Sequence, residues 1–175
     1  WEKNCVAIGL SSGFLEPLES TGIYLIMRGI LNLAKLLPSL PACQATTAEY
    51  NRLMAAEYEN IRDFIVLHYC LSARDDSPFW QSWQRRELPG SLQQKLALYN
   101  TRGALVHNDL DLFASDSWHA VLAGMGKLPR GMVPLVKNTN VSELIKLLQK
   151  IDYSLNHSVE QLFHHKDFLA VYAPG

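Results

Sequence analysis

The spacing of apolar positions changes along the chain, and each spacing predicts a different element. The run Cys5–Leu10 is short and almost continuously apolar, which is typical of a fully buried strand. From Leu18 to Leu37 the chain is apolar nearly all round, which predicts a helix buried on most sides, with Ser20 or Thr21 as its N-cap. The chain thus opens as a strand, a polar loop and a buried helix.

The remaining pattern is helical. A capping box at Thr46-x-x-Glu49 opens a second helix, whose apolar positions recur every three or four residues through His68. His68 is therefore expected to be satisfied within a packed face. Further helices are predicted, in chain order, at 78–83, 92–101, 118–125 and 140–164, the last opened by the capping motif Asn140-x-x-Glu143, followed by an extended tail at 168–172.

A single strand cannot stand alone in a mainly helical chain. The backbone N–H and C=O groups of Cys5–Leu10 need a partner strand, and the chain supplies no obvious sheet. The chain also begins at Trp1 without a methionine or a leader pattern. We therefore expect a mainly α fold in which one or two short strands belong to a sheet upstream of Trp1.

Composition narrows the classes of function. The 175 residues suit one domain, 48% of them are hydrophobic, and the formal net charge is −1 with no basic block. That balance argues against nucleic acid or an anionic membrane surface as the partner. No stretch reaches the roughly 18 uncharged apolar residues of a membrane span. The odd number of cysteines, three, fits a reducing cytoplasm.

The histidines predict no metal site. His164 and His165 are adjacent, so on a helix they point about 100° apart and cannot chelate one ion together. His157 shares a face with His164 but has no third ligand nearby in the sequence.

The most informative stretch joins the predicted strand to the predicted helix. Residues 13–22 read Gly-Phe-Leu-Glu-Pro-Leu-Glu-Ser-Thr-Gly. A strand, a glycine-bearing loop and a helix N-terminus form a layout that binds anions or cofactors. The reason is that the first helical turn has unpaired N–H groups and the positive end of the helix dipole.

The segment Asn4–Gly22, read through this stretch without a gap, resembles the flavin-dependent tryptophan halogenase family. The resemblance continues more loosely through 51–80, which ends in Pro-Phe-Trp, and through 118–126. Members of the family are longer, and their N-terminal part holds a G-x-G-x-x-G flavin motif, a W-x-W-x-I-P signature and an active-site lysine. None of these is present here, and the nearest glycine pattern, Gly124-x-Gly126, has a proline where the third glycine belongs.

The resemblance implies a fold and its division. The chain would be the mainly α, C-terminal part of a two-part FAD-dependent halogenase fold of the GR2 flavoprotein type. Residues 1–22 would form the last strand and the halide and flavin loop of the FAD domain, and residues 23–175 the helical substrate-side domain. This part alone is expected to be inactive.

Four consecutive residues match the family's reactive positions. Glu19 matches the catalytic glutamate. The resemblance implies that its carboxylate stabilises positive charge on the ring during electrophilic halogenation and helps remove the displaced proton, or that it holds the hypohalous acid together with the lysine that is not present here. Ser20 would lie between flavin and substrate as a supporting hydroxyl. Thr21 and Gly22 match backbone positions that bind the halide. The residues alone leave open an ordinary N-cap and a first-turn glutamate placed for the helix dipole.

The resemblance also implies flavin contacts. It assigns them to Gly9 and Leu10, at the end of the predicted strand, and to Thr21, Gly22 and Ile23. Read without the resemblance, Gly9 fits close packing of a strand on a helix.

The substrate region departs from the tryptophan-specific members. They have an adjacent tyrosine pair that this chain lacks. A simpler indole, another electron-rich aromatic or a carrier-bound group is therefore as plausible a substrate as free tryptophan. Phe79, Trp80, Phe113 and Trp118 could line an aromatic pocket, although core packing explains such residues equally well.

The resemblance implies that reduced FAD, O2 and chloride or bromide give hypohalous acid, which halogenates an indole or tryptophan-like aromatic in secondary metabolism. A separate flavin reductase would supply the reduced FAD, and a homodimer stays open. Two other classes stay open as well. One is a non-catalytic helical interaction module or decayed fragment of that fold, and the other is a flavin-dependent monooxygenase that hydroxylates the ring.

Overall fold

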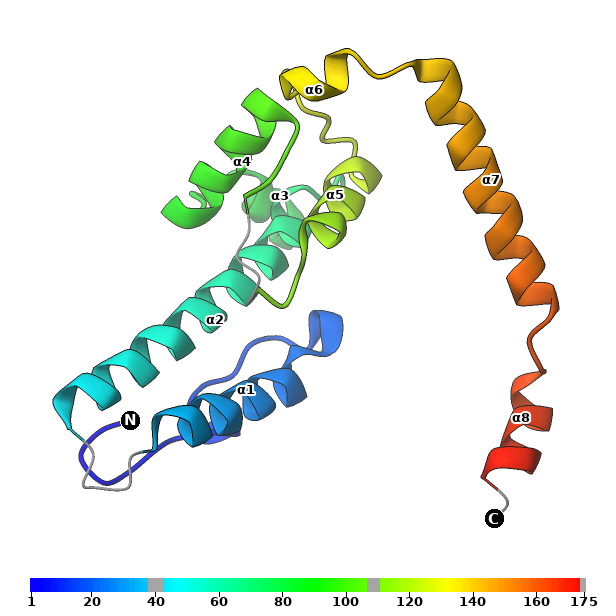
Figure 1. The fold of residues 1–175 in the computed structure, drawn as a ribbon. Coiled ribbons are helices and arrows are strands. Elements are labelled where there is room, and N and C mark those ends of the chain that lie inside the picture. The colour runs from blue at the N-terminus through cyan, green and yellow to red at the C-terminus, as the bar shows by residue number, and fades with distance from the viewer. Residues whose placement is uncertain (38–42, 107–110, 174–175) are drawn as a thin grey trace. The chain divides into compact units, whose positions relative to one another are not determined.

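The computed structural model describes residues 1–37, 43–106 and 111–173, and within these ranges the fold is helical with no strand (Figure 1). The chain divides into two compact units, Trp1–Met132 and Val133–Gly175. The mainly α fold expected from the sequence is confirmed. The helices are, in chain order, α1 Thr21–Leu36, α2 Gln44–Cys70, α3 Pro78–Gln84, α4 Gly90–Arg102, α5 Ser115–Gly124, α6 Pro134–Lys137, α7 Val141–Glu160 and α8 His165–Tyr172.

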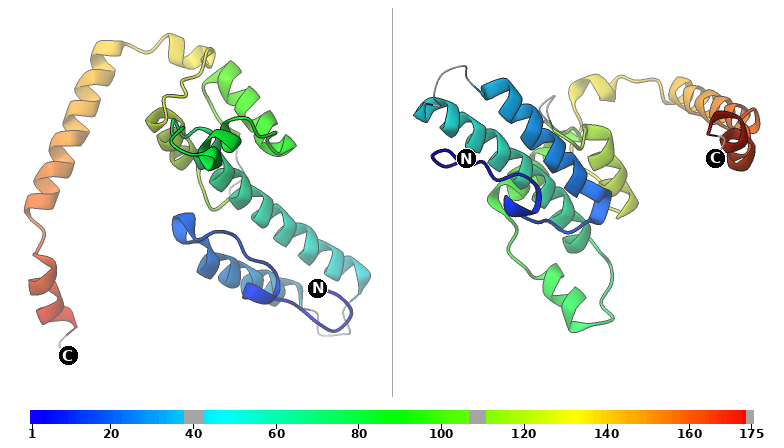
Figure 2. Two further views of the ribbon diagram at one scale, coloured as in Figure 1. Left: turned by 180° about the vertical axis from the view of Figure 1, so that it is seen from behind. Right: turned by 90° about the horizontal axis from the view of Figure 1, so that it is seen from below.

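Helix α2 is the centre of the first unit. Helix α1 lies alongside it, and α3, α4 and α5 gather around its C-terminal half (Figures 1 and 2). The core forms where these helices meet, because α2 places apolar side chains at helical spacing toward its neighbours. Its buried members are Leu25, Ile61, Phe64, Ile65, Leu67, Leu92, Tyr99, Phe113, Trp118 and Leu122.

A mostly buried ion pair joins α1 to α2. Arg28 on α1 places Nε 2.7 Å and Nη2 2.6 Å from Oε1 of Glu57 on α2. The Tyr24 hydroxyl donates to the other carboxylate oxygen of Glu57 at 2.9 Å. Burial, and next this hydrogen bond, raises the pKa of Tyr24, so the phenol keeps its proton and remains a donor.

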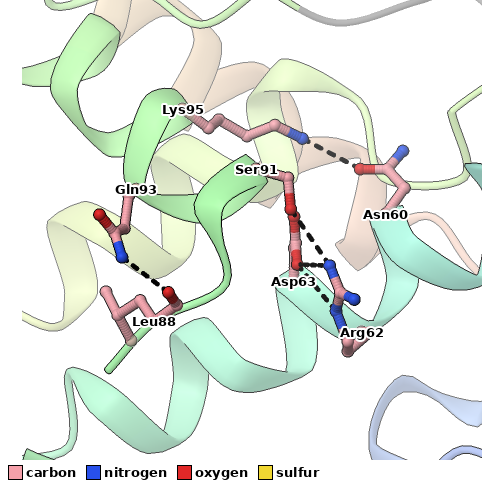
Figure 3. Close-up of polar contacts among 7 residues, drawn as sticks. All are labelled: Asn60, Arg62, Asp63, Leu88, Ser91, Gln93 and Lys95. Atoms are coloured by element: carbon pink, nitrogen blue, oxygen red, sulfur yellow. Dashed lines mark hydrogen bonds and ion pairs between the residues drawn. The ribbon is translucent and has the colours of Figure 1, made fainter. Parts of the chain in front are cut away.

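Polar contacts also hold α4 on α2 (Figure 3). Lys95 Nζ donates to Asn60 Oδ1 at 3.0 Å and lies 4.2 Å from the centre of the Trp118 ring. Burial lowers the pKa of Lys95, while Asp111 and Asp63 oppose that shift. Arg62 donates to Ser91 at 3.1 Å, which adds a second polar contact between α2 and α4.

The second unit has no described core. All of its described side chains are exposed from Pro134 to Ala173, although α7 repeats apolar residues at helical spacing. Asn140 caps α7 as predicted, because its side-chain oxygen accepts from the N–H groups of Ser142 and Glu143. Helix α7 ends at Glu160, four residues before the predicted end.

The strand predicted at Cys5–Leu10 does not form in the described residues. Only an isolated bridge joins Glu2 to Cys5, and Gly9–Ser11 makes a 3-10 turn. Ile8 keeps an extended backbone, but no second segment pairs with it, and a strand requires such a partner. The tail 168–172, predicted to be extended, is helical and belongs to α8. Five residues are too few to distinguish a helical from an extended spacing of apolar positions.

Two predicted helix starts are corrected too. The helix expected from Leu18 begins at Thr21, after a 3-10 turn at Leu18–Ser20. Helix α2 begins at Gln44, before the predicted capping box. Thr46 instead pairs with Cys43, and Glu49 pairs with Arg52, so neither side chain caps the helix.

Replacing Glu57 with leucine should destabilise the intact protein by about 3 kcal/mol, because it leaves the mostly buried Arg28 guanidinium unpaired. Urea unfolding followed by circular dichroism measures the change. Arg52→Gln, which breaks the exposed pair with Glu49, is the control and should leave the unfolding midpoint unchanged. Equal effects of the two substitutions would contradict the role given to the buried pair.

Candidate functional site

The loop from Gly9 to Ser20 lies against two helices, α1 and α2. It consists of the 3-10 turns Gly9–Ser11 and Leu18–Ser20, joined by a segment without regular structure. Three side chains of α2 contact it. Tyr58 bonds to Ser12, Tyr69 to Glu16, and His68 pairs with Glu19.

Two consecutive residues of the loop have a left-handed backbone. Glu19 has φ 67° and ψ 12°, and Ser20 has φ 55° and ψ 37°. Each such residue other than glycine costs about 1 to 3 kcal/mol and persists where the surrounding contacts impose it. The strain falls on the two residues that the sequence predicts to be catalytic.

Glu19 faces a histidine that the sequence pattern placed in a packed face. Oε1 of Glu19 lies 3.6 Å from Nε2 of His68, an ion-pair distance when the imidazole is protonated. The other ring nitrogen, Nδ1, lies 2.8 Å from the Phe64 carbonyl, which can only accept, so Nδ1 carries a proton. Nε2 is therefore the ring nitrogen that faces Glu19.

The N-terminus of α1 presents Thr21 and Gly22, the predicted halide positions. Ser20 occupies the N-cap position but makes no capping hydrogen bond. The first-turn N–H groups therefore receive no acceptor from the cap. The Thr21 hydroxyl is buried and has no hydrogen-bond partner among the described residues. Space around Gly22 is open, since a Cβ there would meet nothing within 4 Å.

Four of the five predicted flavin residues line one hollow of about 190 Å³, and the fifth, Thr21, is buried and does not line it. Gly9, Leu10, Gly22 and Ile23 all line it, although Gly9 and Gly22 come from different turns of the chain. Leu10 is 81% exposed and Ile23 is 73% exposed. This hollow is apolar and has a helix N-terminus at its edge.

The four predicted pocket aromatics fall into two separate clusters. Phe79 and Trp80 lie at the surface with Trp83 and Tyr69, whose ring stacks on that of Trp80 at 5.6 Å. Arg74 lies over the Trp80 ring at 4.6 Å.

Phe113 and Trp118 instead pack in the core. Their rings lie 3.9 Å and 5.0 Å from that of Phe64, centre to centre. This placement fits the core alternative for these two residues. A substrate role for any of the four stays a prediction.

Three functional candidates escaped the sequence reasoning: Tyr58, His68 and Tyr69. All three are on α2, and the pattern treated Tyr58 and His68 as parts of one apolar face. The available signal was the recurrence of side chains with polar ring atoms among apolar positions of the helix. That signal does not reveal which distant residue each ring contacts.

Among residues 1–37, 43–106 and 111–173, no group of three or more histidine, cysteine or acidic side chains could hold a metal ion. None of the helices described is long and apolar enough to cross a membrane.

Comparison with known proteins identifies the family of this chain. The family model for tryptophan halogenase matches residues 1–141. Tryptophan 7-halogenase RebH of Lentzea aerocolonigenes is 34% identical over 149 residues, covering 77% of this chain and 28% of RebH.

Solved structures agree. Xcc4156, a flavin-dependent halogenase from Xanthomonas campestris, is 41% identical with a TM-score of 0.91, covering 100% of this chain and 35% of that one. BrvH, a flavin-dependent halogenase from Brevundimonas sp. BAL3, is 41% identical with a TM-score of 0.88, covering 97% and 35%. The chain belongs to the tryptophan halogenase family. It spans about a third of the length of these relatives.

The two aromatic clusters should respond differently to truncation. Phe113→Ala is expected to lower the free energy of unfolding by about 3 to 5 kcal/mol, because it opens a cavity beside Phe64. Phe79→Ala should cost less than about 1 kcal/mol, as expected of an exposed position. The side chains are 8% and 53% exposed, respectively. Urea unfolding of both variants measures these changes. A loss of unfolding free energy in Phe113→Ala as small as that in Phe79→Ala would contradict the place of Phe113 in the core.

Proposed function

We propose that the protein carrying this chain is a flavin-dependent halogenase of an electron-rich aromatic, and that this chain supplies its glutamate, halide and part of its flavin surface. One observation carries the proposal: Glu19 adjoins a helix N-terminus whose first turn lines the same apolar hollow as Gly9 and Leu10. Neither an ordinary N-cap nor a dipole-paired glutamate requires that hollow.

The residues present fit FAD and a halide. The apolar hollow and its exposed Leu10 and Ile23 suit the face of a flavin ring. The N–H groups of Thr21 and Gly22 and the partnerless Thr21 hydroxyl suit an anion. Reduced flavin bound there would supply the oxidising equivalents, taken from O2, that turn a halide into hypohalous acid. A separate flavin reductase is the proposed source of reduced FAD.

Glu19 is proposed to act on the ring under attack. Electrophilic halogenation builds positive charge on the aromatic, and a fixed carboxylate stabilises that charge. The ring proton that the halogen displaces then passes to Glu19. His68, whose Nε2 lies 3.6 Å from Oε1 of Glu19, is proposed to orient that carboxylate. Ser20, beside Glu19, is proposed to support the same step with its hydroxyl.

The substrate is proposed to be an indole or tryptophan-like aromatic. RebH is a tryptophan 7-halogenase, whereas the names of Xcc4156 and BrvH state no substrate. The chain has no adjacent tyrosine pair, so free tryptophan is one of several substrates to test. Chloride and bromide are both to be supplied.

The proposed arrangement keeps residues 1–22 as the end of the flavin domain and 23–175 as the substrate side. Three cysteines without disulfide partners, Cys5, Cys43 and Cys70, suit a reducing cytoplasm. Whether the protein forms a homodimer is to be tested by measuring its molecular mass in solution.

Glu19→Gln tests the catalytic role in the intact protein with FAD, a reductase, NADH and halide. Product from an indole or phenol should fall about a hundredfold, the scale of one lost electrostatic stabiliser. Flavin oxidation should continue, because the amide keeps the shape of the loop. Unchanged product would remove Glu19 from catalysis, and a hydroxylated product that needs no halide would identify a monooxygenase.

His68 is tested by two replacements. His68→Phe should reduce product about tenfold, the scale of one charge-assisted contact. His68→Gln, whose amide still donates toward Glu19, should recover much of that loss. The measurement is product formed per flavin oxidised, and equal loss in both variants would contradict a contact made through Nε2.

A further inference from the structure

We propose that Tyr58 and Tyr69 of α2 form a hydroxyl clamp: they hold the two ends of segment 12–16 and thereby fix the flavin turn relative to the catalytic glutamate. Tyr58 and Tyr69 are positioning residues in this proposal, since each acts through the loop residue that it hydrogen-bonds. The meaning of the clamp for catalysis rests on the proposed function, whereas its existence rests on geometry alone.

Tyr58 holds the first end through a chain of hydrogen bonds. The Ser12 hydroxyl donates to the Gly9 carbonyl at 2.7 Å, which uses its single proton. The Tyr58 hydroxyl therefore donates to Ser12 Oγ at 2.9 Å, which is closer than its other acceptor, the Gly13 carbonyl at 3.4 Å. The chain therefore runs from α2 through Ser12 to Gly9, a residue that lines the hollow. Successive hydrogen bonds of this kind strengthen one another.

The Tyr58 ring also shapes the space around the turn. A Cβ added at Gly13 would lie 3.2 Å from the Tyr58 ring, so glycine lets the backbone approach the ring closely. Tyr58 lines the apolar hollow and also a second hollow of about 360 Å³ that contains Ser11 and Ser12. Tyr58 therefore lines both hollows, while its hydroxyl holds the turn through Ser12.

Tyr69 holds the other end. Its hydroxyl donates to the Glu16 carboxylate. That hydrogen bond, and next burial, raises the pKa of Tyr69, so the donor keeps its proton. The ring is itself held by aromatic contacts with Trp80 and Trp83 at 5.6 Å and 4.9 Å, which limits movement of the hydroxyl. The surface aromatic cluster thus supports Glu16 through Tyr69.

The spacing of the two tyrosines places them on one side of α2. Eleven positions separate Tyr58 from Tyr69, which is close to three helical turns, so both residues point to the same side of α2 with their Cα atoms about 16 Å apart. The two hydroxyls therefore hold the loop at two separate points, Ser12 and Glu16.

The same helix offers a matched control. Tyr50 is buried, and its hydroxyl has no hydrogen-bond partner among the described residues. Tyr50→Phe removes the same atom as Tyr58→Phe and Tyr69→Phe without removing a contact to the loop. Glu16→Gln provides a rescue, because an amide carbonyl still accepts from Tyr69, while Glu16→Ala does not.

The experiment measures amide hydrogen exchange of segment 12–20 in the intact protein without flavin. Exchange should rise roughly fivefold in Tyr58→Phe and in Tyr69→Phe, the ratio expected for one lost hydrogen bond. It should stay within about twofold of the parent in Tyr50→Phe and in Glu16→Gln. Exchange within α2 serves as the check that each variant is folded.

Flavin titration by fluorescence then separates the two ends. Tyr58→Phe should raise the dissociation constant of FAD roughly fivefold. Tyr69→Phe should leave it within about twofold and instead lower the product formed per flavin oxidised, because it loosens the glutamate side.

Unchanged loop exchange in both tyrosine variants, or an equal rise in Tyr50→Phe, would overturn the clamp. Failure of the parent protein to bind FAD or to halogenate any aromatic would instead overturn the proposed function, and the exchange result would still decide the clamp.

Discussion

The placement of the site depends on the ion pair that joins α1 to α2. Removing Arg28 and Glu57 from water is costly, and the cost is offset here because the carboxylate accepts from the guanidinium and from the Tyr24 hydroxyl. Helix α1 begins with the proposed halide positions, and α2 carries side chains that contact the loop. Fixing one helix on the other therefore fixes the proposed anion-binding end of α1 relative to its supporting residues.

The sequence pattern located the helices better than their ends. Periodic apolar positions predicted α2, because burial on one face imposes that spacing over many turns. The same spacing predicted α7, although its described side chains are exposed. A cap rests on a single side chain, and a local competitor can take it. Asn140 meets no such competitor and caps α7, whereas Thr46 bonds to Cys43 instead. The strand at Cys5–Leu10 has a suitable composition, but composition cannot supply a partner strand.

The candidate site was partly predictable for a similar reason. Glu19, Thr21 and Gly22 are neighbours in the sequence, so a family pattern can carry them. Their supports come from α2, where His68 lies 49 positions from Glu19 and Tyr69 lies 53 positions from Glu16. No local spacing encodes such a contact. The four aromatic candidates show the opposite error. Their similar side chains suggested one pocket, but packing separates them into a surface cluster and a core cluster.

The left-handed backbone at Glu19 and Ser20 has a consequence for laboratory evolution. Glycine adopts that conformation without a steric penalty, so it relaxes the loop at either position while deleting a side chain proposed to act in catalysis. Under the proposed function, selection for heat resistance alone would thus favour glycine here and steadily enrich inactive clones. A library built for a hardier enzyme needs these two codons held constant, or a turnover screen run alongside the thermal one.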